Sequence, residues 1–296
     1  MNSEDGYALT IVLLISLIII VLGMGMAWTV RSRTDIAIGL NDRNSAYLKS
    51  YSALNEVIYH IVTSTFTPTG LQFHPGNGKE TGWNLYGRPI EISDGVNVRL
   101  RDTAGMVSVL FEPDLLKALV EHASGDSKKT VAFLDTLADW QDTDNLKRLN
   151  GAEAFDYRTA GYAYGPRNFY IQVPQEIMLL KGFDKDIFEK IKGDLTYWGG
   201  DTVNYLTMSE SLLKALLHND SLVERIIKIR REGRLTGRLF RDLTGIQATE
   251  RNIFMPNGLI QVDITARAGK AVDRIEAVLE KKQWERRPYL VTEWRE

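Results

Sequence analysis

The run YALTIVLLISLIIIVLGMGMAWTV, residues Tyr7 to Val30, contains 24 residues and no charged side chain. At about 1.5 Å per residue, a helix of this length crosses a hydrocarbon core of roughly 30 Å. A cleaved secretory signal has a basic start and a shorter apolar core, whereas this chain starts with the acidic sequence MNSED. The run therefore predicts a single membrane anchor. Arg31 and Arg33 follow it, and by the positive-inside rule alone they would place the C-terminal part in the cytoplasm.

The helical pattern continues beyond the anchor. Apolar or aromatic residues recur at steps of three, four and seven, at Leu40, Tyr47, Tyr51, Leu54, Ile58 and Ile61. This spacing predicts an amphipathic continuation of the helix that ends near Ser64. A helix from Tyr7 to Ser64 would be on the order of 85 Å long.

The pattern then becomes that of strands around a helical stretch. Residues 66–82, FTPTGLQFHPGNGKETG, contain two Pro and four Gly and predict a surface connection. Apolar and polar residues alternate in 90–100 and again in 260–266, which predicts strands. From 113 to 245 the apolar period is helical. We therefore expect an α+β fold, in which an inserted all-α domain interrupts a small antiparallel sheet.

Composition excludes several kinds of chemistry. The net charge is −2 and the calculated pI is 6.2, so the whole chain has no general attraction for nucleic acid or anionic lipid. The sequence has no cysteine, which excludes disulfides and thiolate metal sites. Its four histidines are dispersed, and it has no G-x-S-x-G, H-E-x-x-H, phosphate-loop or dinucleotide motif. The sequence therefore predicts a protein that is not an enzyme.

Carboxylates crowd the stretch LADWQDTDNLKRLNGAEAFDY, residues 137–157. Asp142, Asp144 and Glu153 have the spacing of positions 1, 3 and 12 of an EF-hand loop. Lys147 stands where that loop needs glycine, so the backbone must follow another path. Oxygen ligands without histidine or cysteine favour a hard cation over zinc. Asp139, at the end of a predicted helix, adds a charge that opposes the helix dipole.

The alternative for this stretch is a solvated acidic loop in which Lys147 and Arg148 are local counter-ions. Two other segments, residues 179–191 and the basic run 225–241, allow a DNA-binding interpretation, because the first resembles a helix-hairpin-helix. Asp184 replaces the second hairpin glycine, however, and a carboxylate there repels phosphate. A basic helix face that packs or pairs within the protein is the favoured interpretation of 225–241.

The N-terminus resembles a class III prepilin signal. In such signals a peptidase cuts after a glycine, here Gly6, and leaves Tyr7 as the mature, methylated N-terminus. The glutamate that usually follows five residues after the cut is Ile11 here. In this respect the chain resembles the minor pseudopilin K family of type II secretion systems.

Four further stretches resemble that family in order and spacing. They are LRDTAGMVSVL (100–110), the acidic stretch 137–157, RNFYIQVPQEIMLLKGFDKDIFEKI (167–191) and TVNYLTMSESLLKAL (202–216). The expected domains are a prepilin leader (1–6), a transmembrane segment (7–30), an amphipathic continuation of the helix (31–65), a pilin-like β region (66–110), an inserted α-helical domain with helix-hairpin-helix-like units (111–245) and a second pilin-like β region (246–296).

The resemblance implies a non-enzymatic minor pseudopilin at the tip of the pseudopilus, which initiates or caps assembly and supports protein export across the outer membrane. The implied partners are minor pseudopilins I and J, other pseudopilins, the prepilin peptidase, and a secreted substrate or the secretin, with no nucleic acid. The implied location is the bacterial inner membrane, single-pass, with the large C-terminal part in the periplasm, which overrides the orientation from Arg31 and Arg33. The alternatives are a minor pilin of a type IV pilus and a membrane-tethered helix-hairpin-helix DNA-binding protein.

The resemblance also implies structural calcium in the helical domain. By matching position, the best candidate ligands are Asp142, Asp144 and Glu153. The weaker candidates are Asp139, Asp156 and Asn168.

Overall fold

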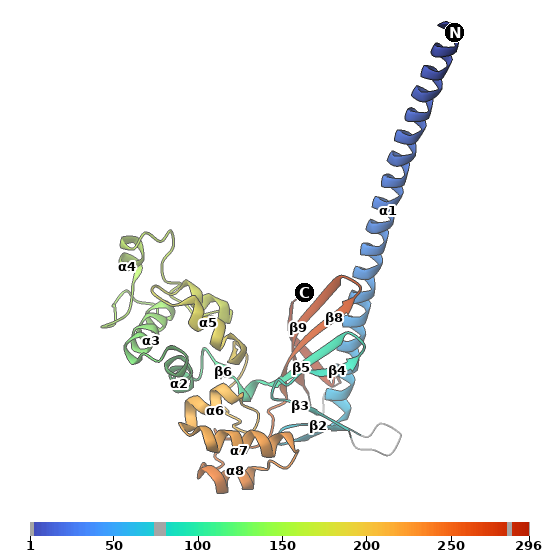
Figure 1. Ribbon diagram of the computed structural model, residues 1–296. Coiled ribbons are helices and arrows are strands. Elements are labelled where there is room, and N and C mark those ends of the chain that lie inside the picture. Colours follow the sequence, from blue (N-terminus) through green and yellow to red (C-terminus); the bar gives the residue numbers. More distant parts are fainter. Residues whose placement is uncertain (1–2, 74–80, 283–285, 296) are drawn as a thin grey trace.

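The computed structural model describes residues 3–73, 81–282 and 286–295. Its first element is a 61-residue helix, α1 (Ser3–Thr63), which projects far beyond the rest of the molecule in Figure 1. Among the described residues, α1 is the one helix long and apolar enough to cross a membrane. The helix ends at Thr63, one residue before its predicted end at Ser64.

The last third of α1 packs on a five-stranded antiparallel sheet with strand order β10-β9-β8-β5-β4. The strands are β4 (Ile90–Ser93), β5 (Val96–Asp102), β8 (Leu259–Ala268), β9 (Ala271–Lys281) and β10 (Tyr289–Arg295). Along β5 and β8 every second residue is buried, as the predicted alternation requires. Apolar side chains of α1 and of one sheet face form a common core.

The buried face of α1 matches the predicted stripe at Leu54 and Ile61, which are 3% and 0% exposed, and differs from it nearer the N-terminus. Ala46, Ser50 and Ala53 are almost fully buried, whereas Leu40 is 60% exposed and Tyr47 is 42% exposed. The small side chains let the sheet approach the helix closely, and the Ser50 hydroxyl donates a hydrogen bond to Asp273 of β9. The predicted apolar positions near Tyr47 therefore flank the contact with the sheet.

The prediction of a surface connection over residues 66–82 was wrong for the described part of that segment. β1 (Thr65–Thr67), β2 (Gly70–Phe73) and β3 (Thr81–Asn84) form a second, three-stranded antiparallel sheet. Leu71 and Trp83 lie opposite each other and are 2% and 7% exposed. A Cβ at Gly70 would lie 2.3 Å from the Trp83 carbonyl oxygen, so this glycine serves close packing. Residues 74–80 lie outside the described residues.

The helical region is inserted between β5 and β8 and has a separate apolar core. In Figure 1 it lies to one side of the sheet, near the end of α1 that is opposite the N-terminus. Its elements are η1 (Thr103–Gly105), β6 (Val107–Ser108), α2 (Pro113–Ser124), α3 (Ser127–Gln141), α4 (Ala154–Thr159), η2 (Pro174–Leu179), α5 (Lys185–Ile191), η3 (Lys192–Asp194), β7 (Leu195–Thr196), α6 (Glu210–Leu217), α7 (Asp220–Arg231) and α8 (Gly237–Thr244). The predicted α+β class, with a long helix, an antiparallel sheet and a helical insertion, is confirmed.

A buried carboxylate joins the insertion to the sheet. Asp102, at the end of β5, is 1% exposed. It accepts hydrogen bonds from Asn204 Nδ2 at 2.8 Å, from Thr207 Oγ1 at 2.9 Å, and from the backbone N–H groups of Ala104 and Asn257 at 3.3 Å each. Burial raises the pKa of Asp102 above its ordinary value, and the four donors oppose this rise.

Candidate metal centre

The acidic stretch follows α3 directly. Asp126 begins this helix by accepting the backbone N–H groups of Lys128 and Lys129, and Asp142 ends it with an extended backbone. The chain then crosses an irregular loop over residues 142–153 before α4 begins at Ala154. The loop therefore holds carboxylates next to the C-terminal end of a helix, where the dipole disfavours negative charge.

Three of the predicted ligands meet in this loop. Carboxylate oxygens of Asp142, Asp144 and Glu153 lie within 4.8 Å of one another. Glu153 is 5% exposed. Both of its carboxylate oxygens, and Asp142 Oδ1, are buried and have no hydrogen-bond partner among the described residues. The three residues are here called the acidic cluster. Asp142 and Glu153 supply buried oxygens that a bound cation would satisfy, whereas Asp144 is exposed and accepts the Leu146 backbone N–H at 2.7 Å.

Electrostatics also favours a cation at the acidic cluster. Burial raises the pKa of Glu153, and repulsion from Asp139, Asp142 and Asp144 raises it further. The side chains of the cluster offer only carboxylate oxygens as metal ligands, and such oxygens are the ligands of hard divalent cations. The arrangement fits cation binding, and the described part of the loop offers no histidine or cysteine for a softer metal.

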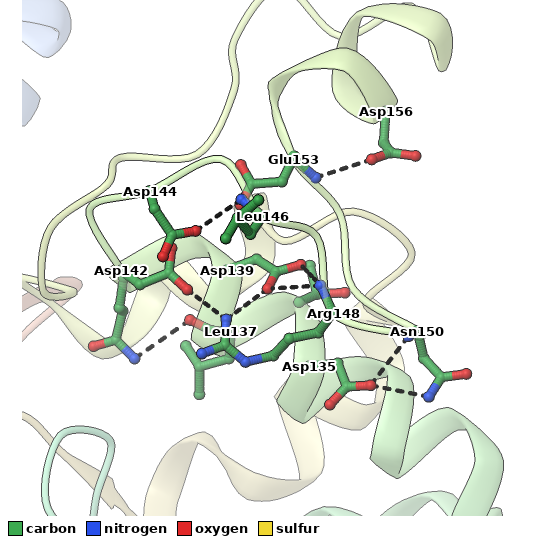
Figure 2. A network of polar contacts seen from close by, with 12 residues as sticks. Asp135, Leu137, Asp139, Asp142, Asp144, Leu146, Arg148, Asn150, Glu153 and Asp156 are labelled. Atoms are coloured by element: carbon green, nitrogen blue, oxygen red, sulfur yellow. Dashed lines mark hydrogen bonds and ion pairs between the residues drawn. The ribbon is translucent and has the colours of Figure 1, made fainter.

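Asp139 supports the loop from α3 and does not join the cluster. Its side chain is fully buried. It accepts the Arg148 backbone N–H at 3.2 and 3.3 Å and Arg148 Nη1 at 2.7 Å. One turn earlier, Asp135 accepts the Asn150 backbone N–H at 3.1 Å and its Nδ2 at 2.9 Å. Figure 2 shows these contacts between α3 and the returning loop.

The other two candidate ligands also have different surroundings. Asp156 pairs with Lys147 at 2.7 Å and accepts the Glu153 backbone N–H at 3.0 Å. These contacts, Lys147 first, lower the pKa of Asp156. Asn168 has a φ of 52°, and its backbone N–H donates to the Trp140 carbonyl at 3.0 Å. The structure thus gathers three of the six candidates, Asp142, Asp144 and Glu153.

Arg148 was expected as a local counter-ion, but its bridging position and a second supporting contact were not predicted from the sequence. Arg148 Nη1 bonds Asp142 as well as Asp139, so its guanidinium bridges the helix end and the cluster (Figure 2). Trp140 Nε1 donates to Glu176 at 2.9 Å, which anchors the helix end to the following segment. The signal for the tryptophan contact was present, because a buried indole N–H normally has an acceptor, but its partner is 36 residues away.

The segments considered for DNA binding have structural uses. Arg230, within the basic run, is 5% exposed; it donates to the carbonyls of Leu206 and Met208 and lies 4.2 Å from the Tyr86 ring centroid. Asp184 accepts the Asp186 backbone N–H at 2.8 Å and so caps α5. Arg230 and Asp184 therefore make contacts within the protein.

The described elements form a pilin-like fold: a long apolar N-terminal helix, an antiparallel sheet packed on it, and a helical domain inserted into the sheet region. Residues 104–198 match the family model described as type II secretion system (T2SS), protein K. The matched stretch is about a third of the chain and begins directly after β5, so it is this part of the helical insertion that is similar to the family.

The fold also matches a solved structure over most of its length. A chain in the crystal structure of the GspK-GspI-GspJ complex from the enterotoxigenic Escherichia coli type 2 secretion system aligns with a TM-score of 0.56 and 14% identity. The alignment covers 90% of this chain and 98% of the other. At this identity the likeness concerns the fold. A search of curated protein sequences gave no significant match.

Proposed function

We propose that this chain is a minor pseudopilin that forms the tip of a periplasmic pseudopilus, where it initiates or caps assembly and supports protein export across the outer membrane. The observation that carries the proposal is the position of the helical insertion. It lies beside the end of α1 that is opposite the N-terminal anchor, as Figure 1 shows. A domain of this bulk would obstruct a subunit stacked above it.

The anchor end of α1 has the opposite character. From Leu9 to Leu40 its large apolar side chains are about half exposed or more, so they are free to pack against lipid or neighbouring pseudopilin helices. Ile11 stands where pilins usually have glutamate. A tip subunit has no subunit above it to pair with such a carboxylate, and an unpaired carboxylate in lipid is costly. The exposed apolar side chains favour an anchor in the inner membrane, with the sheet and the insertion in the periplasm, and Ile11 favours a subunit that is last in its fibre.

The partners follow from the similar complex, in which GspK assembles with GspI and GspJ. We expect the full-length chain, extracted in detergent, to co-purify with its I-like and J-like pseudopilins. Mass spectrometry of the same sample should find Tyr7 as the N-terminus, and a Gly6→Val variant should keep Met1. An intact Met1 in the wild-type chain, or no association with either partner, would contradict the tip assignment.

We also propose that the acidic cluster binds calcium and that the ion has a structural role. The unpartnered oxygens of Asp142 and Glu153 support this, and the irregular loop suits the flexible coordination of calcium better than the strict octahedron of magnesium. At a calcium concentration one hundred times the Kd, binding would stabilise the fold by about 2.7 kcal/mol.

The test compares melting temperatures of the full-length chain in detergent with calcium, with magnesium and with a chelator. Calcium should raise the melting temperature of the wild-type chain. A double variant, Asp142→Asn with Asp144→Asn, should lose that rise. Its matched control is Glu189→Gln with Asp242→Asn, which removes two carboxylates that are 50% and 58% exposed. If the wild-type chain shows no calcium response, the cluster is a solvated acidic loop.

A further inference from the structure

The bridging guanidinium of Arg148 bears on how the cluster binds its ion. Arg148 Nη1 contacts Asp139 Oδ1 at 2.7 Å and also contacts Asp142 Oδ2. One nitrogen of a protein cation is therefore shared between a carboxylate of α3 and a member of the acidic cluster. In Figure 2 the guanidinium lies just below the cluster.

The two carboxylates hold Arg148 unequally. Asp139 is fully buried and also accepts the Arg148 backbone N–H through both oxygens, at 3.2 and 3.3 Å. Asp142 contacts Arg148 through the guanidinium alone and not through the backbone. The other oxygen of Asp142, Oδ1, is buried without a hydrogen-bond partner among the described residues. Asp139 would therefore keep Arg148 in place if Asp142 turned toward a bound cation.

We infer that Arg148 is a built-in counter-cation that shares Asp142 with the bound metal and so sets the metal affinity of the cluster. This inference rests on the proposed calcium function. Without metal, Arg148 offsets part of the negative charge and lets the loop fold. With metal, Asp142 passes from the guanidinium to the ion, while Arg148 stays on Asp139. The remaining positive charge repels the ion and limits its affinity.

The chain offers a matched control in the neighbouring residue. Lys147 also carries a positive charge, but it pairs with Asp156, outside the cluster. Arg148→Gln and Lys147→Gln remove the same charge from adjacent positions, so a general electrostatic effect would change both variants alike. Arg148→Lys keeps the charge and loses the guanidinium fork.

Calcium binding is measured by titration calorimetry on the full-length chain in detergent, after chelation. Arg148→Gln should bind calcium roughly tenfold or more tightly than wild type, because one neighbouring charge changes the proton affinity of a carboxyl by about ten- to a thousandfold. Without metal it should melt below Lys147→Gln, and calcium should close that difference. Arg148→Lys and Lys147→Gln should bind calcium with nearly the wild-type affinity.

Two results would overturn the inference and leave the calcium function intact: a wild-type calcium affinity or a weaker one in Arg148→Gln, or the same gain in Arg148→Lys. If the wild-type chain binds no calcium, the proposed calcium function fails, and the role of Arg148 fails with it. If Arg148→Gln folds only with calcium, the same affinities are obtained by competition with a fluorescent chelator, starting from the calcium-loaded chain.

Discussion

Gly151 is the residue at which the path of the acidic loop is most sensitive to a single added atom. A Cβ at this position would lie 1.9 Å from Asp139 Oδ2 and 3.1 Å from the Asp135 carbonyl oxygen. Since real Cβ contacts essentially never fall below 3.0 Å, the Asp139 carboxylate must retreat by about an ångström in Gly151→Ala. It is fully buried, so water cannot replace the contacts with Arg148 that it loses.

The cost can be worked from those contacts. Hydrogen bonds to a charged group contribute about 1.5–3 kcal/mol, and breaking a buried ion pair costs about 3–5 kcal/mol. The Arg148 side chain is 42% exposed, and solvent screening reduces the second value. We therefore expect Gly151→Ala to destabilise the helical insertion by about 2–4 kcal/mol. For a domain of the size of the helical insertion, this loss of stability lowers the melting temperature by roughly 10 °C.

The assay is urea unfolding of the full-length chain in detergent with chelator, followed by tryptophan fluorescence. Gly200→Ala is the control, because a Cβ there meets nothing within 4 Å; it should change stability by no more than about 0.5 kcal/mol. Asp139→Ala removes the clashing carboxylate, so Gly151→Ala should cost little in that background, which gives a strongly non-additive double-mutant cycle. Equal midpoints for Gly151→Ala and Gly200→Ala, or additive costs in the cycle, would refute the reasoning.

Three other substitutions test separate parts of the molecule. Burial lowers the pKa of His60 below 6.5, so the unfolded chain binds the proton more tightly and stability is lost as the pH falls below about 6.5. His60→Phe should therefore make thermal melts less sensitive to acidification, and an unchanged pH dependence contradicts this. Tyr157→Phe removes the acceptor of the Lys181 backbone N–H, at 2.9 Å, and should cost about 1–3 kcal/mol in urea unfolding; a neutral effect would show that water takes its place. Asp102→Ala leaves the Asn204 amide and three other donors without an acceptor and should cost roughly 3 kcal/mol or more, which a wild-type melting temperature would disprove.

The sequence predicted the long helix well, and it predicted the contact face of that helix at Leu54, Ile58 and Ile61 but not nearer the N-terminus. Length and apolar spacing are local properties, so α1 could be read from them. The contact depends on close approach, which favours Ala46, Ser50 and Ala53, and an apolar stripe gives no weight to such small side chains. Gly70 contributed to the wrong prediction of a surface connection. The sequence does not distinguish a glycine needed for close packing against Trp83 from a glycine in a flexible loop.

The candidate site was predictable where it depended on spacing. Asp142, Asp144 and Glu153 were found by comparison with a known loop, and the structure brings their oxygens together. The distinction between ligands and supports was not predictable. Asp156 and Asp139 are carboxylates of the same stretch, but Lys147 and Arg148 engage them through a backbone path that is set by tertiary contacts.

Because the fold has two separate apolar cores, calcium should stabilise one part of the chain and leave the other nearly unchanged. The acidic cluster lies wholly within the insertion, whereas α1 packs on the sheet through the second core. The polar contacts of Asp102 and Arg230 join the two parts. Chelation should therefore increase hydrogen exchange in α3 and α4 and leave β5, β8 and β9 protected. Faster exchange throughout the sheet would contradict this separation. A metal-free chain would then keep α1 packed on the sheet but would carry a loosened insertion, and under the proposed tip role capping would be the step that depends on calcium.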